Sequence, residues 1–272
     1  MIVDLHIHTD ASDGCDNPVT LIQKAQAKGI GLLAVSDHDS IDNVAAVQSL
    51  AKQANIEVIS GVEICSSVHK ESFHILAYNF DLQNKGLQEL LQYNQQLLST
   101  KDQETIEILK KLGWAVDLAE YQAYERPRNL GGWKTLNYLQ AKGLCTGVSD
   151  FFERIFTAQN GLSFPTFLSP SEVIAVIHQA GGAAVLAHAG SSFHGQGLQR
   201  ALDIFATQKL DGFECYHPEH SLRDTQLLVE HCQRENLLIT AGSDYHGDFV
   251  PTRHLAQPEV GLEVLNLVGL RD

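Results

Sequence analysis

Positive charge is scarce in this chain. Its 272 residues include 19 lysines and arginines against 33 aspartates and glutamates, which gives a formal net charge of −14. No lysine- or arginine-rich run interrupts this excess, so a surface that binds duplex nucleic acid through bulk electrostatics is disfavoured. An anionic substrate must therefore be held by local charge, and bound metal ions could supply that charge.

Cysteines and long apolar segments are also few. The five cysteines are odd in number and show no CxxC spacing, which argues against a disulfide framework and against a thiolate zinc site. The apolar runs are too short to cross a bilayer, and Asp4 with two histidines stands where a secretory signal needs its apolar stretch. We therefore expect a soluble protein of the reducing cytoplasm, with no membrane partner and no evident protein partner.

Short aliphatic runs alternate with amphipathic stretches, which indicates βα units around a parallel sheet. We predict strands at 2–8, 30–36, 58–61, 72–79, 183–188, 212–216 and 238–241. Helices are expected between them, for example over 18–28 and 170–180, where Asn17 and Ser169 are suitable caps and glycines follow the last turn. The chain length fits one β/α barrel.

Residues 83–167 break this alternation, because they indicate several helices in succession and no strand. The expected helices cover about 85–112, 133–142 and 148–159, with a polar turn at Arg126, Pro127 and Arg128 between the first two. We therefore divide the chain into a first barrel part (1–82), a helical insertion (83–167) and a second barrel part (168–272).

Histidines and carboxylates follow the predicted strands. In Asp4-Leu5-His6-Ile7-His8, alternate residues of a strand share a face, so His6 and His8 point the same way, and Asp13 on the next turn can close on the same ion. Taken alone, this motif also fits two histidines that merely fill a barrel. Further motifs are SDHD (36–39), GVE (61–63), FHIL (73–76), AHAG (187–190) and GSDYH (242–246).

In β/α barrels the loops after the strands form one face, so these side chains are predicted to meet there. The candidate ligands are His6, His8, Asp13, His38, Glu63, His74, His188, Asp244 and His246. Nine ligands are too many for one ion, because each ion takes about four to six including water. The sequence therefore predicts a cluster of two or three divalent ions.

These motifs resemble those of the polymerase and histidinol phosphatase (PHP) family, whose pattern DLHxHTxxSDG, xDHD, GxE, a histidine, AHPG and GSDxH is matched in order. The chain is most similar to small stand-alone members with a helical insertion, which remove phosphate from nucleoside 3′,5′-bisphosphates and trim short RNA. The resemblance implies an α/β fold, a distorted seven-stranded (β/α)7 TIM-like barrel. It also implies manganese, iron, zinc or magnesium as cofactors, and a small phosphorylated substrate or a short oligonucleotide end.

Chemistry and resemblance agree on a metal-dependent phosphoesterase, in which a metal-activated hydroxide attacks phosphorus while the ions draw the other phosphate oxygens. Asp37 and Asp39 are the candidate catalytic residues, which would orient ligands or handle the proton of the nucleophile. The alternative for either residue is a plain strand-end cap.

The stand-alone members of the family carry phosphate-binding arginines at places where this chain has Gln95, Leu98, Lys101, Gly132-Trp133-Lys134 and Ser191. Arginine and lysine are not interchangeable where a two-pronged contact to phosphate is needed, so these changes bear on substrate identity. The candidate substrate contacts that remain are Lys101, Arg126, Arg128, Lys134 and His220. A solvated charge is the alternative for each cation, and a structural hydrogen bond is the alternative for His220.

Two rival functions remain open at this stage. Histidinol-phosphate phosphatase activity uses the same ligand set, and a non-catalytic accessory module could bind metal without turning over an ester. The histidines outside the motifs are expected at the surface or in packing, namely His69, His178, His194, His231 and His254. Cys65 and Cys215 are expected to be packed thiols.

Overall fold

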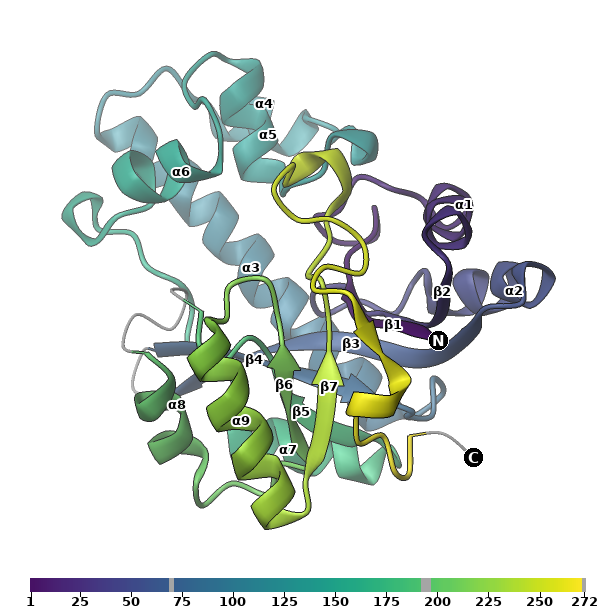
Figure 1. The fold of residues 1–272 in the computed structure, drawn as a ribbon. Helices are drawn as coiled ribbons and strands as arrows, with labels where there is room; N and C mark the ends of the chain where they lie inside the picture. Colours follow the sequence, from purple (N-terminus) through teal and green to yellow (C-terminus); the bar gives the residue numbers. More distant parts are fainter. Residues whose placement is uncertain (69–70, 192–196, 271–272) are drawn as a thin grey trace.

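The computed structural model describes residues 1–68, 71–191 and 197–270, and its strands form one curved sheet (Figure 1). The strands follow one another in the order β7-β6-β5-β4-β3-β2-β1-β8. They are β1 (Ile2–Ile7), β2 (Ile30–Val35), β3 (Glu57–Val68), β4 (Glu71–Tyr78), β5 (Ala183–Leu186), β6 (Gly212–Tyr216), β7 (Leu238–Ala241) and β8 (Val260–Gly261). All seven predicted strands are present. The pattern missed β8, which has two residues.

The sheet closes into a barrel where β1 meets the end of β7. The backbone N–H of His8 donates to the carbonyl of Tyr245 (2.8 Å), and that of Asp244 donates to the carbonyl of His6 (2.8 Å). At the other end, β8 pairs with β1, and Asn266 exchanges two backbone hydrogen bonds with Ile239 of β7. The C-terminal segment therefore fills the seam between the first and last long strands.

The prediction of a parallel sheet is wrong for β4. This strand runs antiparallel to both β3 and β5, whereas the pairs β1–β2, β2–β3, β5–β6 and β6–β7 are parallel. Only two residues separate β3 from β4 in the sequence, and so short a connection joins antiparallel strands, since a parallel pair needs a crossover. Strand β3 is also far longer than predicted, because it continues into this hairpin.

Helices pack around the barrel and extend from it (Figure 1). They are α1 (Pro18–Lys28), α2 (Val44–Ala54), α3 (Lys85–Lys111), α4 (Leu118–Ala123), α5 (Lys134–Ala141), α6 (Val148–Asp150), α7 (Pro170–Gln179), α8 (Leu198–Phe205) and α9 (Leu222–Glu235). N-cap residues that are recognisable in the sequence explain where several of these helices begin. Asn17 accepts from the N–H of Thr20, and Ser169 with Glu172 forms a capping box before α7.

The helical stretch is built on α3, which lies against the barrel at its start and carries α4, α5 and α6 at its far end (Figure 1). No strand occurs among residues 83–167, all of which the structure describes. Eleven buried side chains, including Ile106, Tyr138 and Phe151, form a core cluster separate from those of the barrel. This separate core supports our proposal that 83–167 is an insertion. The helix predicted over 148–159 is broken into α6, a π-helical turn (Phe151–Ile155) and a 3-10 turn (Ala158–Asn160).

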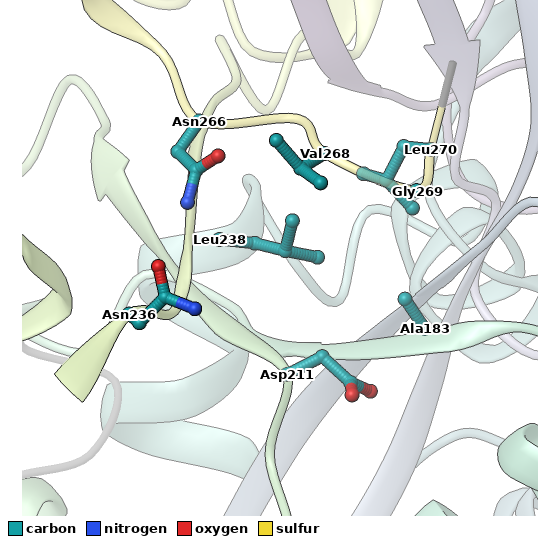
Figure 2. Close-up of a pocket in the computed structure, with 8 residues that line it drawn as sticks. All are labelled: Ala183, Asp211, Asn236, Leu238, Asn266, Val268, Gly269 and Leu270. Atoms are coloured by element: carbon teal, nitrogen blue, oxygen red, sulfur yellow. The ribbon is translucent and has the colours of Figure 1, made fainter. Parts of the chain in front are cut away.

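A pocket of about 390 Å³ opens at the amino ends of β5, β6 and β7 (Figure 2). Its lining residues are Ala183, Asp211, Asn236, Leu238, Asn266, Val268, Gly269 and Leu270. The carboxylate of Asp211 already accepts from His178 Nε2 and from the N–H of Ala184, both at 2.7 Å. This pocket lies at the end of the barrel opposite the predicted ligands. Among the described residues, no helix combines the length and apolar character needed to cross a membrane.

Candidate metal centre

The first strand brings two histidines into the mouth of the barrel. His6 and His8 are fully buried, and their Nε2 atoms face each other at 3.1 Å. The turn after β1 then brings Asp13 back, so that its Oδ1 lies 3.3 Å from His8 Nδ1. Alternation along the strand and the following turn thus place these three side chains together, as predicted.

The other six predicted ligands reach the same place from five further strands. His38 follows β2, His188 follows β5, and Asp244 and His246 follow β7. Glu63 and His74, however, lie within β3 and β4, on the antiparallel hairpin. The sequence pattern had instead placed Glu63 in a loop after its strand. The structure therefore brings all nine predicted ligands to one mouth of the barrel, two of them from strand interiors.

Glu63 lies at the centre of this cluster. Its carboxylate is 1% exposed and faces five histidines. Oε2 lies 3.2 Å from His6 Nε2, 3.2 Å from His8 Nε2 and 3.1 Å from His38 Nδ1. Oε1 lies 2.9 Å from both His74 Nδ1 and His188 Nε2. A single carboxylate that faces five imidazoles could serve as a ligand in more than one of the predicted ion sites.

Ligand atoms gather into sets of the size that one ion needs. Three sets of predicted ligands have their donor atoms within 4.8 Å of one another among the described residues. They are His8, Asp13, His38 and His246; His6, His8 and Asp244; and Glu63, His74 and His188. His8 belongs to two of them. Adjacent sets that share a residue fit a cluster of ions better than isolated sites.

The donor chemistry of the cluster fits divalent cations. His38 Nδ1 and Glu63 Oε2 are buried and lie close to each other at 3.1 Å, yet neither has a contact with hydrogen-bond geometry within the described part of the chain. Burial lowers the pKa of His38 to about 4 and that of His188 to about 3, so both rings are neutral and able to coordinate. Burial opposes charge on His6 too, but Glu214, Glu63 and Asp244 outweigh it and raise its pKa. The carboxylates of the cluster thus stabilise positive charge at this mouth of the barrel.

Cys65 also lies within reach of His38 and His74. Burial, together with the carboxylate of Asp39, raises the pKa of its thiol well above the usual value. A neutral thiol is a poor ligand, which agrees with the expectation of a packed side chain. Cys215 is likewise buried, 3.7 Å from Cys232 across the Sγ atoms.

Two buried carboxylates that the motifs did not single out support the cluster from behind. Glu214 of β6 faces His6 Nδ1 at 2.9 Å and accepts from the backbone N–H of His188 at 2.7 Å. Asp4 accepts from Ser243 Oγ at 2.7 Å and from the N–H of Ser243 at 2.9 Å, which fixes the turn before Asp244. Such outer partners orient ligands and set the tautomer of a ligating histidine. Asp4 was visible in the first motif; Glu214 carried no motif signal.

The two candidate catalytic aspartates are also buried, Asp37 against the turn after β1 and Asp39 against α3 and β3. Asp37 accepts from Thr9 N (2.7 Å), Thr9 Oγ1 (2.6 Å) and Ser12 Oγ (2.5 Å). Asp39 accepts from Asn94 Nδ2 at 2.7 Å and from the N–H of Cys65 at 3.2 Å. Burial raises the pKa of Asp39 to about 6 despite these bonds. The contacts fit the orienting role among the expected alternatives.

The predicted substrate contacts are dispersed. Arg126 reaches the mouth, where it donates to the carbonyls of Gly132 and Asp10, and Arg128 is exposed close by. Lys134 donates to the carbonyl of Gln122 and lies over the Tyr121 ring, and Lys101 pairs with Glu104 at 2.6 Å. These two lysines are engaged within the helical region.

His220 uses both ring nitrogens. Its Nδ1 donates to the carbonyl of Cys215 at 3.0 Å, and its Nε2 accepts from the N–H of Gly190 at 3.0 Å. This arrangement favours the structural alternative for His220. Of the histidines outside the motifs, His178 binds Asp211, His231 contacts Arg234 and His254 is exposed. His69 and His194 lie outside the described residues.

Arg253 and His217 are functional candidates that the sequence reasoning did not commit to. The Arg253 guanidinium donates to Asp244 Oδ2 and to Glu219 Oε1, the latter at 2.5 Å. His217 Nε2 lies 3.5 Å from the same Asp244 oxygen. The position of His217 after a strand was a usable signal. Arg253 had none, because only the folded loop brings it back to the mouth.

Comparison with known proteins adds independent information. The model of the PHP domain matches residues 4–146 of this chain. The 5′-3′ exoribonuclease Rnm of Escherichia coli (strain K12) is 28% identical over 250 residues, which cover 90% of this chain and 85% of that protein. The 3′,5′-nucleoside bisphosphate phosphatase of Chromobacterium violaceum is 26% identical over 254 residues, 90% of this chain and 87% of that protein. A crystal structure from Bifidobacterium adolescentis, assigned as a metal-dependent phosphoesterase, superposes with a TM-score of 0.83 at 27% identity, covering 96% of this chain and 93% of that one.

Proposed function

Because this chain belongs to the PHP domain family and is a metal-dependent phosphoesterase, we propose that it hydrolyses small nucleotide-like phosphate esters, such as 3′,5′-bisphosphates. The observation that carries this proposal is the convergence of six imidazoles and three carboxylates at one mouth of the barrel, where Glu63, one of these carboxylates, faces five of the imidazoles. Relatives that cover most of the chain and act on nucleotides or RNA support the substrate class.

In this proposal the nine predicted ligands hold two or three divalent ions, of which manganese, iron, zinc and magnesium are the candidates. When bound, such ions supply hydroxide at neutral pH and positive charge against the oxygens of a phosphate. Imidazole ligands suit iron and zinc better than magnesium, which prefers oxygen ligands and retains water, and the carboxylates of the set also suit manganese. The ligand set therefore favours the transition metals within the group of candidates.

The remaining residues of the chain act on the ligands and on the substrate. Asp37 holds the turn between His8 and Asp13 through Thr9 and Ser12, and Glu214 fixes the ring of His6. Arg126 is the predicted substrate-binding cation with contacts at the mouth, and we propose that it faces the part of the substrate nearest the helical region. We propose that Arg128, which is exposed close by, binds a second phosphate group of the substrate.

The proposal is tested with purified protein supplied with manganese. We expect release of inorganic phosphate from adenosine 3′,5′-bisphosphate, and we expect His6→Ala to abolish it, because His6 faces Glu63 and Asp244 at the centre of the cluster. His254→Ala is the matched control, since His254 is exposed. Histidinol phosphate and short RNA with a 5′-phosphate are assayed beside the bisphosphate. Preferred turnover of histidinol phosphate would replace the substrate assignment, and stoichiometric metal without turnover of any ester would contradict catalysis.

A further inference from the structure

We infer that Arg253 and His217 form an anion subsite beside the metal centre, which binds non-bridging oxygens of a phosphate group. The inference deepens the proposed function and rests on it for the identity of the substrate. His217 follows β6 and Arg253 follows the 3-10 turn Gly247–Phe249, so two separate segments supply the subsite. Both side chains converge on one atom, Oδ2 of Asp244.

The state of the His217 ring is the first argument. Its Nδ1 accepts from the backbone N–H of Glu219 at 3.1 Å, so the ring proton of the neutral tautomer is on Nε2. This Nε2 is buried in a residue that is 3% exposed, and its contact with Asp244 Oδ2, at 3.5 Å, lacks the geometry of a hydrogen bond. A buried N–H donor whose nearby acceptor is this distant is poorly satisfied, and such a group in a native protein calls for a ligand or water that completes it.

The geometry of Arg253 is the second argument. Its guanidinium uses one N–H toward Asp244 and one toward Glu219, while a guanidinium carries five N–H donors. The residue is partly buried at the mouth, where its charge is screened less than at an open surface. Planar guanidinium groups bind phosphate oxygens through paired hydrogen bonds, so the unused donors suit a phosphate.

Charge at the mouth is the third argument. Asp244 turns Oδ1 toward His8 Nε2 at 3.1 Å, on the side of the predicted ligands, and turns Oδ2 toward Arg253 and His217. The donors beside Oδ2 thus already face a carboxylate oxygen at the edge of the cluster. A phosphate oxygen is an acceptor of the same kind. The substrate would therefore meet metal charge on one side and these two N–H groups on the other.

The rival role is a purely positioning one, in which Arg253 and His217 only hold Asp244 in its orientation. The two roles differ in a measurable way. A positioning role predicts that loss of either side chain weakens metal binding. An anion subsite predicts that metal binding is retained while phosphate binding weakens.

The experiment measures both quantities on the full chain. Manganese binding to the metal-free protein is followed by electron paramagnetic resonance of free Mn²⁺, and inorganic phosphate binding to the manganese-loaded protein is followed by calorimetry. For Arg253→Gln and His217→Phe we expect phosphate affinity to fall by about 10- to 100-fold, as for loss of a charge-assisted hydrogen bond. Manganese affinity should change less than about threefold. Arg253→Lys keeps the charge, retains Asp244 pairing and should lie between wild type and Arg253→Gln.

Arg223→Gln and His254→Gln are the matched controls, because both residues are exposed and change the same side-chain types. The inference is overturned if manganese affinity falls while the phosphate affinity of fully loaded variants is unchanged, or if neither quantity changes. Phosphate binding is measured by calorimetry and does not require the protein to turn over a substrate. A failure to hydrolyse any ester would therefore count against the proposed function and leave the binding result interpretable.

Discussion

Glu214 illustrates how the metal centre depends on a residue that contacts the ligands from behind. Its two oxygens face His6 Nδ1 and the backbone N–H of His188, so one carboxylate ties two candidate ligands that lie far apart in the sequence. Histidines opposite this carboxylate keep its pKa below the usual value despite burial, which by itself would raise it. Glu214 is therefore ionised at neutral pH and orients His6 as a hydrogen-bond acceptor.

We predict that Glu214→Gln lowers metal affinity or activity by about 10- to 100-fold, the usual effect of losing an outer partner of a ligand. The amide can also turn its NH₂ group toward His6 and so disfavour the tautomer that leaves Nε2 free. Manganese titration and phosphate release check the prediction, with Glu230→Gln on the exposed side of α9 as control. A variant with unchanged metal affinity and rate would exclude this role.

At the residue scale, strand alternation and strand-end position were enough to find the nine candidate ligands. These two signals were enough because the ligands lie in or just after strands, and the strands are recognisable in the sequence as short aliphatic runs. Arg253 and Glu214 were not found, since their roles depend on which distant side chain they meet. Local sequence carries little information about such long-range pairs. Lys134 was placed at the substrate by resemblance alone, and in the structure its contacts are Gln122 and Tyr121.

Two glycines just before α5, Gly131 and Gly132, join the helical region to the metal centre. The N–H of Gly132 donates to the carbonyl of Asp13 at 2.7 Å, and Gly131 has a positive φ of 69°. A Cβ on Gly131 would lie 2.4 Å from Phe249 Cβ and 2.9 Å from the Asp13 carbonyl oxygen. The Phe249 ring in turn stands 6.4 Å from that of His246.

We predict that Gly131→Ala destabilises the protein by roughly 2–4 kcal/mol, from backbone strain plus overpacking, and also weakens metal binding through Asp13 and His246. Gly143→Ala is the matched control, because Gly143 shares the positive φ (68°) but has open space around its Cβ. It should cost about 1 kcal/mol and leave metal binding intact. Denaturant unfolding and manganese titration measure both. Equal effects of the two substitutions would contradict the proposed connection.

The interior of the helical region carries its own titrating group. Asp102 of α3 lies near Tyr121 Oη (3.3 Å), and burial raises its pKa to about 6 from 3.8. Between pH 4 and 6 the folded protein therefore binds more protons at Asp102 than the unfolded chain does. The free energy of unfolding must fall as pH rises through this window and then level off.

We predict that Asp102→Asn removes this part of the pH dependence and stabilises the protein above pH 6, by an amount on the order of 2 kcal/mol. The amide oxygen can still accept from Tyr121. Because Asp4 and Asp39 also have pKa values raised to about 6, the quantity to measure is the difference between variant and wild type. Urea unfolding at pH 4, 6 and 8 provides it. A difference independent of pH would refute the prediction.

At the scale of elements, strand positions were predicted well because the barrel strands are short, aliphatic and flanked by clear turns. The direction of β4 was predicted wrongly, because period and composition do not depend on strand direction. The helix expected over 148–159 is broken at Phe151–Ile155, where buried Phe151 and Ile155 pack into the core of the helical region. Tertiary packing overrode the local pattern there.

For the whole molecule, metal binding and stability are linked, because the ligand cluster exists only in the folded chain. An ion that binds the native state alone stabilises it by about 2.7 kcal/mol at 100 times its Kd. We predict that manganese at that concentration raises Tm by roughly 5 to 10 °C over chelator-treated protein. Glu63→Gln should abolish most of this shift, since Glu63 faces five of the histidines, whereas His254→Gln should keep it. A wild-type Tm insensitive to chelator would contradict the linkage.

The seam between β1 and β7 has a consequence for biosynthesis. Ribosomes deliver a chain from its N-terminus at about 5–20 residues per second, so His6 and His8 emerge well before Asp244 and His246. Since the carbonyl of His6 and the N–H of His8 pair with the segment that carries these last ligands, the nascent chain cannot assemble the full set of candidate ligands before that segment has been made. The predicted ligand cluster is thus completed late in synthesis, and a polypeptide stalled before Asp244 would lack two of the nine candidate ligands and the backbone partners of His6 and His8.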